Sequence, residues 1–403
     1  MFLITGDNWV VDGFKVRMNA SRRFTHATSN TGVTFQNNRV EVKPGAQEYA
    51  FIVQTASNVT VKGNWAHHYP HCINGGETYA AGPWGDGGTA PACGTHSRCD
   101  FDTTNSSDIF NISGNGTGAA DSNLVFEEND FGHWQNPVRI RNFTNVTVRR
   151  NKCTNATNHG CWEMDDVLGA VIENNIADID TGPGCSDEIL QSSLFDSYCF
   201  EDVVIRNNTV VGKGLGWQQQ LAVLAPNPGA DSRCNDGIAP EVADDGTEYD
   251  YFRVYNNIIY DGKPSGSYGV GLSTSNAAAE PSPCCHSDYN LIHRPSGGTV
   301  GSDGSTRYRT LAEWRSHGKD LNGTDAAPQF MNYSASDFRP LNVSAPQVNA
   351  GVNNASFPCP ANDYFGNPRS DGRCDIGAIE LQGGGTSDPS PGTVTNVNRT
   401  DVK

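Results

Sequence analysis

The chain has 403 residues and a formal net charge of −17, with 28 basic against 45 acidic residues. This acidic balance argues against nucleic acid and anionic membranes as partners, because both repel a negative surface. No long run of apolar residues occurs, so no membrane span is expected. Twelve scattered cysteines without a CxxC pair favour disulfides, and therefore a secreted chain.

One short phrase recurs from the N-terminal end onward: an apolar residue, two polar residues, Asn, and a further apolar residue nearby. Residues 2–14 already read as strand, turn and strand. Copies of the phrase follow as FQNNRV from Phe35, VKGNW from Val61, FEEND from Phe126, VRRNK from Val148, IENNI from Ile172, IRNNTV from Ile205, VYNNII from Val254 and SDYNLI from Ser287. Three of the seven intervals between copies are 22–26 residues long, and the longer ones read as the same period plus a loop or a missed copy. Alternating runs before the copies indicate short strands.

A short strand and a turn in every period of about 24 residues are typical of a parallel β-solenoid, in which each period forms one coil. Asn suits the turn because it tolerates left-handed backbone angles, and its amide can bond to the Asn of the next coil. We therefore expect a column along one edge of the solenoid, made of Asn129, Asn151, Asn175, Asn208 and Asn257.

These repeats resemble the right-handed parallel β-helix proteins, the pectin-lyase-like superfamily of secreted and mostly polysaccharide-active proteins. The C-terminal runs LAEW from Leu311, APQF from Ala327 and DIGAIE from Asp375 are similar to the ending of many secreted bacterial β-helix proteins. The resemblance covers roughly residues 2–381. It implies an all-β fold, a single-stranded right-handed parallel β-helix with long loop insertions, over residues 1–382. It does not fix the reaction.

The two ends of the chain differ in composition. Residues 2–14 lack an obvious cap, so we expect that N-terminal coils or a cap precede them in the complete protein. Residues 383–403 are rich in Gly, Ser, Pro and Thr, which predicts a flexible linker or tail.

A second series of alternating runs carries the candidate chemistry. VRIR from Val138 and CWEMD from Cys161 are offset by one period, so their strands should be adjacent, with Val138, Ile140, Trp162 and Met164 facing inward. The outward positions then set two arginines against two carboxylates that both face solvent. The predicted catalytic residues are Arg139, Arg141, Glu163, Asp165 and Asp166.

Aromatic and amide side chains near this face predict sugar contacts, since sugar rings pack on aromatic platforms. We expect Trp134 and Trp217 in flanking loops, a strand with His71 and Asn74 on the N-terminal side, and a strand with the glutamines on the other. The predicted substrate-binding residues are His71, Asn74, Trp134, His159, Trp217, Gln218 and Gln220.

Two chemistries fit this face. Glu163 and Asp165 would lie about 6.5–7 Å apart along one strand, which suits an inverting glycosidase. In a lyase, an Arg or His would take the proton beside a uronate, and carboxylates would hold a Ca²⁺ that neutralises the sugar acid. The sequence departs from the polygalacturonase-type pattern, because Asn158-His-Gly160 precedes Asp165-Asp166 instead of following it. The alginate-epimerase Asp-Pro-His motif and the pectate-lyase-type base motifs are not found.

The predicted function is therefore a secreted protein that binds and cleaves a polysaccharide. A surface ladder of opposite charges without any function would give the same pattern. The alternative function is a non-catalytic glycosylated protein, either adhesive or a subunit of an extracellular filament or sheath, whose bare ends stack end to end.

Covalent modifications are predicted at asparagines and cysteines. The fourteen glycosylation sequons begin at Asn19, Asn58, Asn105, Asn111, Asn115, Asn142, Asn145, Asn155, Asn207, Asn322, Asn332, Asn342, Asn354 and Asn398. The predicted disulfides are Cys93–Cys99, Cys153–Cys161, Cys185–Cys199 and Cys359–Cys374. The histidines His67, His68 and His71 have no carboxylate at ligand spacing, so no metal site is predicted there.

Overall fold

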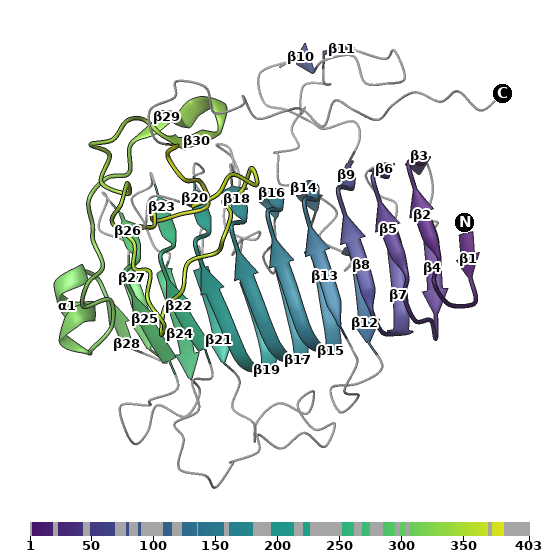
Figure 1. Ribbon diagram of the computed structural model, residues 1–403, viewed down its shortest axis with the longest axis horizontal. Helices are drawn as coiled ribbons and strands as arrows, with labels where there is room; N and C mark the ends of the chain where they lie inside the picture. Colours follow the sequence, from purple (N-terminus) through teal and green to yellow (C-terminus); the bar gives the residue numbers. More distant parts are fainter. Residues whose placement is uncertain are drawn as a thin grey trace, which may run out of the picture.

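The computed structural model describes residues 2–18, 23–42, 49–68, 78–79, 88–89, 108–114, 123–134, 136–156, 161–179, 195–212, 221–225, 252–261, 268–274, 285–294, 299–303, 306–369 and 373–382. Within these ranges nearly all regular structure is β, and most strands pair in parallel (Figure 1). The prediction of an all-β fold with parallel strands is confirmed at this level. No helix in these ranges is long and apolar enough to cross a membrane.

The strands lie in three rows, which the chain visits in turn. The first row contains β1 (Phe2–Ile4), β4 (Thr25–Thr28), β7 (Phe51–Ala56), β12 (Asp108–Gly114) and the N-terminal parts of β15 (Asn136–Arg149), β17 (Trp162–Glu173) and β19 (Phe195–Arg206). The second row contains β2 (Val10–Asp12), β5 (Thr34–Gln36), β8 (Val59–Lys62), β13 (Leu124–Glu127), the C-terminal parts of β15, β17 and β19, β22 (Phe252–Tyr255) and β25 (Cys285–Asp288).

The third row is a separate nine-stranded sheet. It contains β3 (Lys15–Met18), β6 (Arg39–Val42), β9 (Trp65–His68), β14 (Asp130–Trp134), β16 (Lys152–Ala156), β18 (Ile176–Ile179), β20 (Thr209–Gly212), β23 (Ile258–Asp261) and β26 (Leu291–His293). The strands β21 (Leu221–Ala225), β24 (Tyr268–Thr274), β27 (Thr299–Asp303) and β28 (Thr306–Tyr308) form a four-stranded sheet. Short antiparallel pairs are β10 (Thr78–Tyr79) with β11 (Gly88–Thr89) and β29 (Phe330–Asn332) with β30 (Asp337–Pro340).

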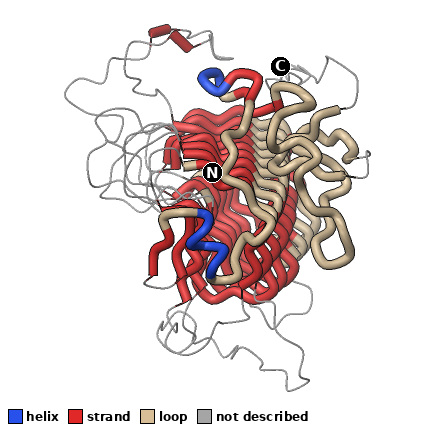
Figure 2. Tube along the Cα trace, turned by 90° about the vertical axis from the view of Figure 1, so that its left-hand side faces the viewer, coloured by secondary structure: helices blue, strands red, loops and turns tan. Residues whose placement is uncertain are grey.

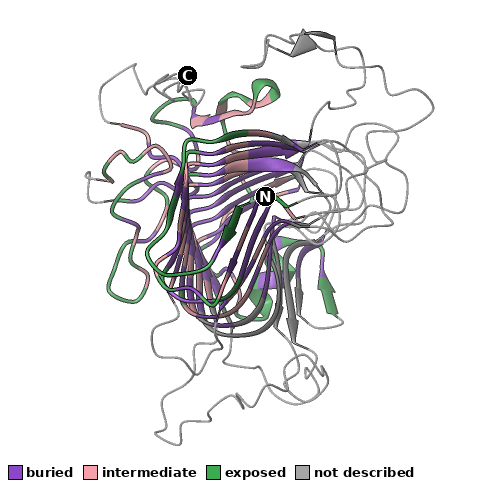
Figure 3. Cartoon of the chain, turned by 90° about the vertical axis from the view of Figure 1, so that its right-hand side faces the viewer, coloured by how far each residue is buried: buried purple, intermediate pink, exposed green. Residues whose placement is uncertain are grey.

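Each pass through the three rows forms one coil, and consecutive coils pair strand for strand. For example, β4 pairs in parallel with β7, β5 with β8, and β6 with β9. Figure 2 views this stack along its long axis. The side chains that alternate toward the inside form one continuous core, in which Phe51 stacks on Phe110 and Phe131 packs edge-on against Trp162. Figure 3 shows these buried positions running through all the coils.

A ladder of buried asparagines runs through the corner between the second and third rows. Its members are Asn38, Asn64, Asn129, Asn151, Asn175, Asn208, Asn257 and Asn290. In each step the backbone N–H and Nδ2 of one Asn donate to Oδ1 of the next, at 2.9–3.0 Å. The predicted column is confirmed. The expected left-handed backbone lies one residue earlier, as at Asn174 (φ 54°) and Asn207 (φ 51°), so the phrase divides the two roles between neighbouring positions.

The ladder ends at the buried Asp320. Its carboxylate accepts from the backbone and side chain of Asn290 (3.1 and 2.9 Å), and Nε1 of Trp314 donates to its second oxygen at 2.9 Å. Burial raises the pKa of Asp320 above its usual value, and the hydrogen bonds from Asn290, Trp314 and Ser287 offset this rise only in part. Trp314 belongs to α1 (Leu311–Ser316), whose N-terminus is capped by Thr310. A carboxylate has no N–H group with which to continue the ladder. Asp320 and the helix α1 packed beside it therefore close this end.

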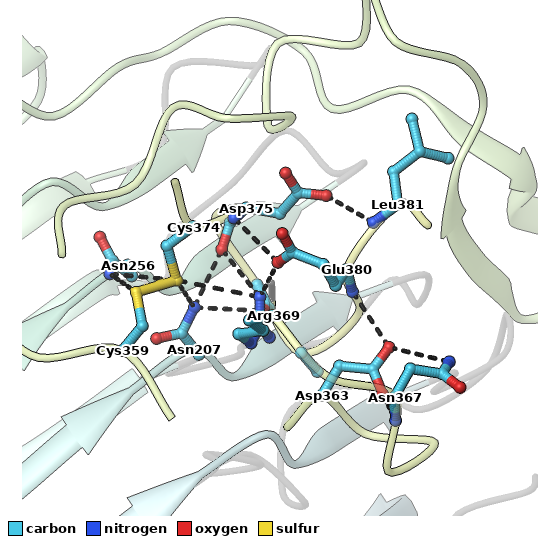
Figure 4. A network of polar contacts seen from close by, with 12 residues as sticks. Asn207, Asn256, Cys359, Asp363, Asn367, Arg369, Cys374, Asp375, Glu380 and Leu381 are labelled. Atoms are coloured by element: carbon cyan, nitrogen blue, oxygen red, sulfur yellow. Dashed lines mark hydrogen bonds and ion pairs between the residues drawn. A yellow bond between two sulfur atoms is a disulfide. The ribbon is translucent and has the colours of Figure 1, made fainter. Parts of the chain in front are cut away.

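The C-terminal segment packs against the outside of the coils after a 3₁₀ turn η2 (Tyr333–Ala335). Nδ2 of Asn207 donates to the carbonyl of Asp375 at 2.9 Å, and a buried ion pair joins Arg369 to Glu380 (Figure 4). The disulfide Cys359–Cys374 lies in the same network. These polar contacts fasten residues 349–369 and 373–382 to the turns that follow β17, β19 and β22.

Two of the predicted disulfides are confirmed, Cys153–Cys161 and Cys359–Cys374, with Cα–Cα distances of 5.9 and 6.4 Å. Cys93, Cys99 and Cys185 lie outside the described residues. Cys199 lies in β19, but its side chain is not among those described.

Candidate functional site

Strands β15 and β17 are adjacent and pair in the register that the one-period offset in the sequence predicts. In β15 and β17, Arg139 is the register partner of Glu163 and Arg141 that of Asp165. The alternate positions Val138, Ile140, Trp162 and Met164 are fully buried in the core. The positions of Arg139 and Glu163, like those of Arg141 and Asp165, are therefore one strand spacing of about 4.8 Å apart.

Arg139 and Glu163 form a tight ion pair. Nη2 of Arg139 lies 2.6 Å from Oε1 of Glu163. Glu163 as a residue is only 2% exposed, and the Arg139 side chain is 21% exposed. The expectation that Glu163 faces solvent is wrong: alternation in a strand separates the inside of a coil from its outside, and it does not show what covers the outside. Losing one partner of such a pair leaves an uncompensated buried charge.

The neighbours of this pair differ from those expected. On the N-terminal side β12 lies beside β15, with Asn111 opposite Arg139 and Ser113 opposite Arg141. His71 and Asn74, expected on that side, lie outside the described residues. On the other side β19 lies beside β17, and Gln218 to Gln220, expected there, also lie outside the described residues.

Two residues that the sequence did not indicate complete the rows. Asp196 is the register partner of Glu163, and Tyr198 that of Asp165. The sequence period does not indicate them, because residues 180–194 separate β18 from β19 and lengthen the spacing between the two coils. The alternating run in the sequence around Phe195 was the only available signal. One row is thus Asn111, Arg139, Glu163 and Asp196, and the next is Ser113, Arg141, Asp165 and Tyr198.

In the earlier coils each third-row strand is followed by a first-row strand. In the last coils β21 follows β20 and β24 follows β23 in the same way. Long segments precede first-row strands or follow β21 and β24. Residues 69–107, which include the short pair β10 and β11, precede β12, and residues 180–194 precede β19. Residues 226–251 follow β21, and residues 275–284 follow β24. Long connections on a rigid scaffold commonly carry binding and catalytic groups. Two of these segments, residues 69–107 and 180–194, join the third row to the first row.

The remaining predicted contact residues are placed only in part. Trp134 is the last residue of β14, so it lies at a strand end and not in a loop. Asp165 and Asp166 lie in β17, but their side chains, like that of Trp134, are not among those described. His71, Asn74, His159, Trp217, Gln218 and Gln220 lie outside the described residues.

A charge ladder on the second row provides a structural comparison. There Lys62 and Arg149 flank Glu127 at 2.8 and 2.7 Å, and Arg206 lies 2.6 Å from Glu173. Lys62 and Arg149 are each 41% exposed, and the C-terminal segment contacts Arg206. Opposite charges can thus stack on this solenoid for purely structural reasons. The pair at Arg139 differs in lying on the first row, where residues 69–107 lead into β12 and residues 180–194 lead into β19.

No group of three His, Cys, Asp or Glu side chains suited to a metal ion occurs among the described residues. His67 is instead paired through Nε2 with Asp130 at 2.9 Å, on the outer side of the third row. Burial raises the pKa of Asp130, but the positive charges of His67, Lys152 and Arg39 outweigh burial, so that the pKa lies below its usual value.

The sequon asparagines differ in accessibility. Asn207 is fully buried and donates to Asp375, so its amide is not open to a glycan in the folded chain. Exposed residues are Asn58, Asn145, Asn322, Asn332, Asn342 and Asn354, while Asn111 and Asn142 are half-buried. The side chain of Asn155 is not described, and Asn19, Asn105, Asn115 and Asn398 lie outside the described residues.

No protein-family model matches this chain, and no curated protein matches it. Among solved structures, a PL6 family alginate lyase, AlyGC, is similar at 9% sequence identity with a TM-score of 0.30. The match covers 89% of this chain and 56% of that one, so the chain spans little more than half the length of the lyase. A likeness of this size identifies neither a family nor an activity.

Proposed function

We propose that the protein binds an acidic polysaccharide on the outer side of the first row and cleaves it. The observation that carries this proposal is the Arg139–Glu163 ion pair, 2.6 Å long, on the first row, whose strands β12 and β19 follow the long segments 69–107 and 180–194. Guanidinium groups recognise carboxylates in a bidentate geometry. Arg139 and Arg141 are therefore the groups that would hold the sugar acid.

Among the two chemistries, the geometry favours elimination over hydrolysis. An inverting glycosidase needs one carboxyl group that is protonated, so that it can donate a proton to the leaving oxygen. Oε1 of Glu163 lies 2.6 Å from Nη2 of Arg139, so the guanidinium occupies the place that a leaving oxygen would have to take at this oxygen. In an elimination, a base removes the proton beside the uronate carboxylate, the glycosidic C–O bond breaks, and a C=C bond forms while the leaving oxygen takes up a proton. No water is consumed.

In this proposal Glu163 positions Arg139, and Arg139 and Arg141 hold the sugar carboxylate while negative charge develops on it. Asp165, Asp166, Asp196 and Tyr198 supply candidates for the proton transfers. Ca²⁺ could assist by neutralising the sugar acid. Because Glu163 is paired with Arg139, the described side chains provide no complete calcium site. The mechanism therefore includes no calcium step, and the assay below tests the cation separately.

The wider setting is part of the same proposal. We infer that residues 1–382 form one right-handed, single-stranded parallel β-helix domain and that residues 383–403 are a linker or tail. The two disulfides favour an oxidising compartment, and the exposed sequon asparagines suit a secreted glycoprotein. Of the predicted glycosylation sites, Asn207 is not proposed, because its amide is buried.

The alternative is a non-catalytic subunit of an extracellular filament or sheath. Its support is the first coil, which exposes Phe2, Leu3, Trp9, Val10 and Phe14. Head-to-tail stacking needs two open ends, however, and the other end of the ladder is closed by Asp320 and α1. The closed end argues against this alternative.

The test is incubation of the protein with a panel of uronate polymers (polygalacturonate, alginate, hyaluronate) and neutral polymers (xylan, cellulose), with Ca²⁺ and with chelator. Reducing ends and the ultraviolet absorbance of unsaturated sugars are followed together. The proposal expects both signals to rise in step on a uronate polymer. Reducing ends without absorbance would mean hydrolysis. No cleavage of any polymer, together with ordered polymers of the protein under the electron microscope, would support the filament subunit.

A further inference from the structure

Four polar side chains lie together on the outer side of the first row, in the coils before the candidate site. Nε2 of His26 donates to Oε1 of Gln54 at 2.9 Å, and Oγ1 of Thr28 lies 3.1 Å from the same nitrogen. Because an amide oxygen can only accept, the proton belongs on Nε2, which leaves Nδ1 as the acceptor that faces Nη1 of Arg23 at 3.5 Å. Arg23 and Gln54 are exposed, and His26 and Thr28 are half-buried.

This cluster is not needed to hold the coils together. Strands β4 and β7 are already paired through their backbones from Thr25 to Thr28. Hydrogen bonds between exposed side chains contribute little to stability, because water replaces them readily. The contacts instead fix the imidazole in one orientation beside an amide, a hydroxyl and a guanidinium.

The cluster is aligned with the candidate site. His26 is the register partner of Ile52, Ile52 that of Asn111, and Asn111 that of Arg139. His26 and Arg139 therefore stand in one row, three strand spacings or about 14 Å apart. Ile52, between His26 and Asn111 in this row, is only 3% exposed, so a glycan chain would cross above the groups that cover Ile52 to reach both positions. A short oligosaccharide held at Arg139 would not reach His26.

We propose that Arg23, His26, Thr28 and Gln54 form a distal binding subsite for an acidic polysaccharide whose reacting unit lies at Arg139, an inference that rests on the proposed function. Arg23 supplies the charge for a second uronate carboxylate. The amide, imidazole and hydroxyl supply hydrogen bonds to sugar hydroxyls, the mixture of groups that fixes a polar ligand in an open site.

Asn111 lies between the two positions, and it begins a sequon. A glycan on its Nδ2 would occupy the row that the substrate needs. The subsite therefore requires an unmodified Asn111, whereas glycosylation at the exposed Asn58 or Asn145, which lie at the corner between the first and second rows, is compatible with it.

The test compares kcat/KM on the best uronate polymer of the panel with kcat/KM on its purified oligosaccharides of increasing length. The variants are Arg23→Ala and His26→Ala, and Lys15→Ala removes an equally exposed cation from the third row as a control. We expect the ratio of polymer to shortest cleaved oligosaccharide to fall about tenfold in both variants, the effect of one charged hydrogen bond, and to stay constant in the control. Affinity electrophoresis in gels that contain the polymer should show the same loss of retention, with unchanged thermal unfolding midpoints.

An unchanged ratio in both variants would overturn the subsite while the proposed function stands. An equal loss on substrates of every length would also overturn it, because the cluster would then act on the reacting site itself. Peptide mapping that finds a glycan on Asn111 of the active protein would contradict it as well. If the wild-type chain cleaves no uronate polymer, the proposed function fails, and the subsite fails with it.

Discussion

The ladder asparagine Asn151 should be among the most sensitive polar positions of the fold. Its Oδ1 accepts from the backbone N–H and Nδ2 of Asn129 at 2.9 and 3.0 Å, and its Nδ2 donates to Oδ1 of Asn175 and to the carbonyl of Phe126, both at 2.9 Å. Asn151→Ala removes four hydrogen bonds. It leaves the buried backbone N–H of Asn129 without an acceptor, and it leaves Nδ2 of Asn129 with only the carbonyl of Val61. At about 1–3 kcal/mol for each of these two losses, the free energy of unfolding should fall by about 2–6 kcal/mol.

Asn123 offers a matched control, because it is an asparagine in a second column of amides that is partly open to water. It donates to Asn58 at 2.7 Å and accepts from Asn145 at 3.3 Å. Water can replace these bonds, so Asn123→Ala should cost less than about 1 kcal/mol. Chemical denaturation of both variants measures the difference. If Asn151→Ala loses no more unfolding free energy than Asn123→Ala, the ladder does not stabilise the coils as argued.

Three further outcomes follow from the contacts. Glu163→Gln should lower turnover about 100-fold, because Arg139 loses the carboxylate that positions it. Glu173→Gln removes a carboxylate from an ion pair of equal length on the second row and should leave turnover unchanged. Steady-state kinetics on the cleaved polymer would show equal losses if the first row were not the site. Burial raises the pKa of Glu127, but hydrogen bonds and charges from Lys62 and Arg149 outweigh it and hold the pKa below its usual value. The folded state therefore binds fewer protons at Glu127 than the unfolded state. The contribution of this carboxylate to the free energy of unfolding is present above about pH 4.3 and is lost as pH falls through the lowered pKa. The difference in unfolding free energy between wild type and Glu127→Gln should shrink on acidification, and a constant difference would refute this. Finally, peptide mapping without reductant should recover Cys153–Cys161 and Cys359–Cys374, and Cys359→Ser should destabilise the C-terminal segment by about 2–4 kcal/mol; protection from proteolysis equal to wild type would contradict the fastening role.

The sequence could predict whatever repeats without interruption. The asparagine column follows from a polar residue that recurs at each turn, and the pairing of Val138 with Trp162 follows from one clear period between them. The same reasoning failed beside this pair, because residues 69–107 and 180–194 shift the next strands away from the expected spacing. Asp196 and Tyr198 were missed for that reason.

Three-dimensional packing decides the rest. Alternation placed Glu163 outside the coil, but its burial depends on what packs against the outside. The left-handed residue could not be distinguished from the ladder residue in an Asn-Asn pair, since both positions favour Asn. Copies such as Arg150 followed by Asn151 show that only the second position requires the amide. The end of the ladder at Asp320 depends on Trp314 of α1, and the repeat pattern does not predict this helix.

The most direct measurement is a crystal structure of the Glu163→Gln variant with an oligosaccharide of the uronate polymer that the wild-type chain cleaves. The account predicts that the glycan lies across β12, β15, β17 and β19, with a sugar carboxylate against Arg139 or Arg141. A glycan bound on the second or third row, with the outer side of the first row empty, would contradict it.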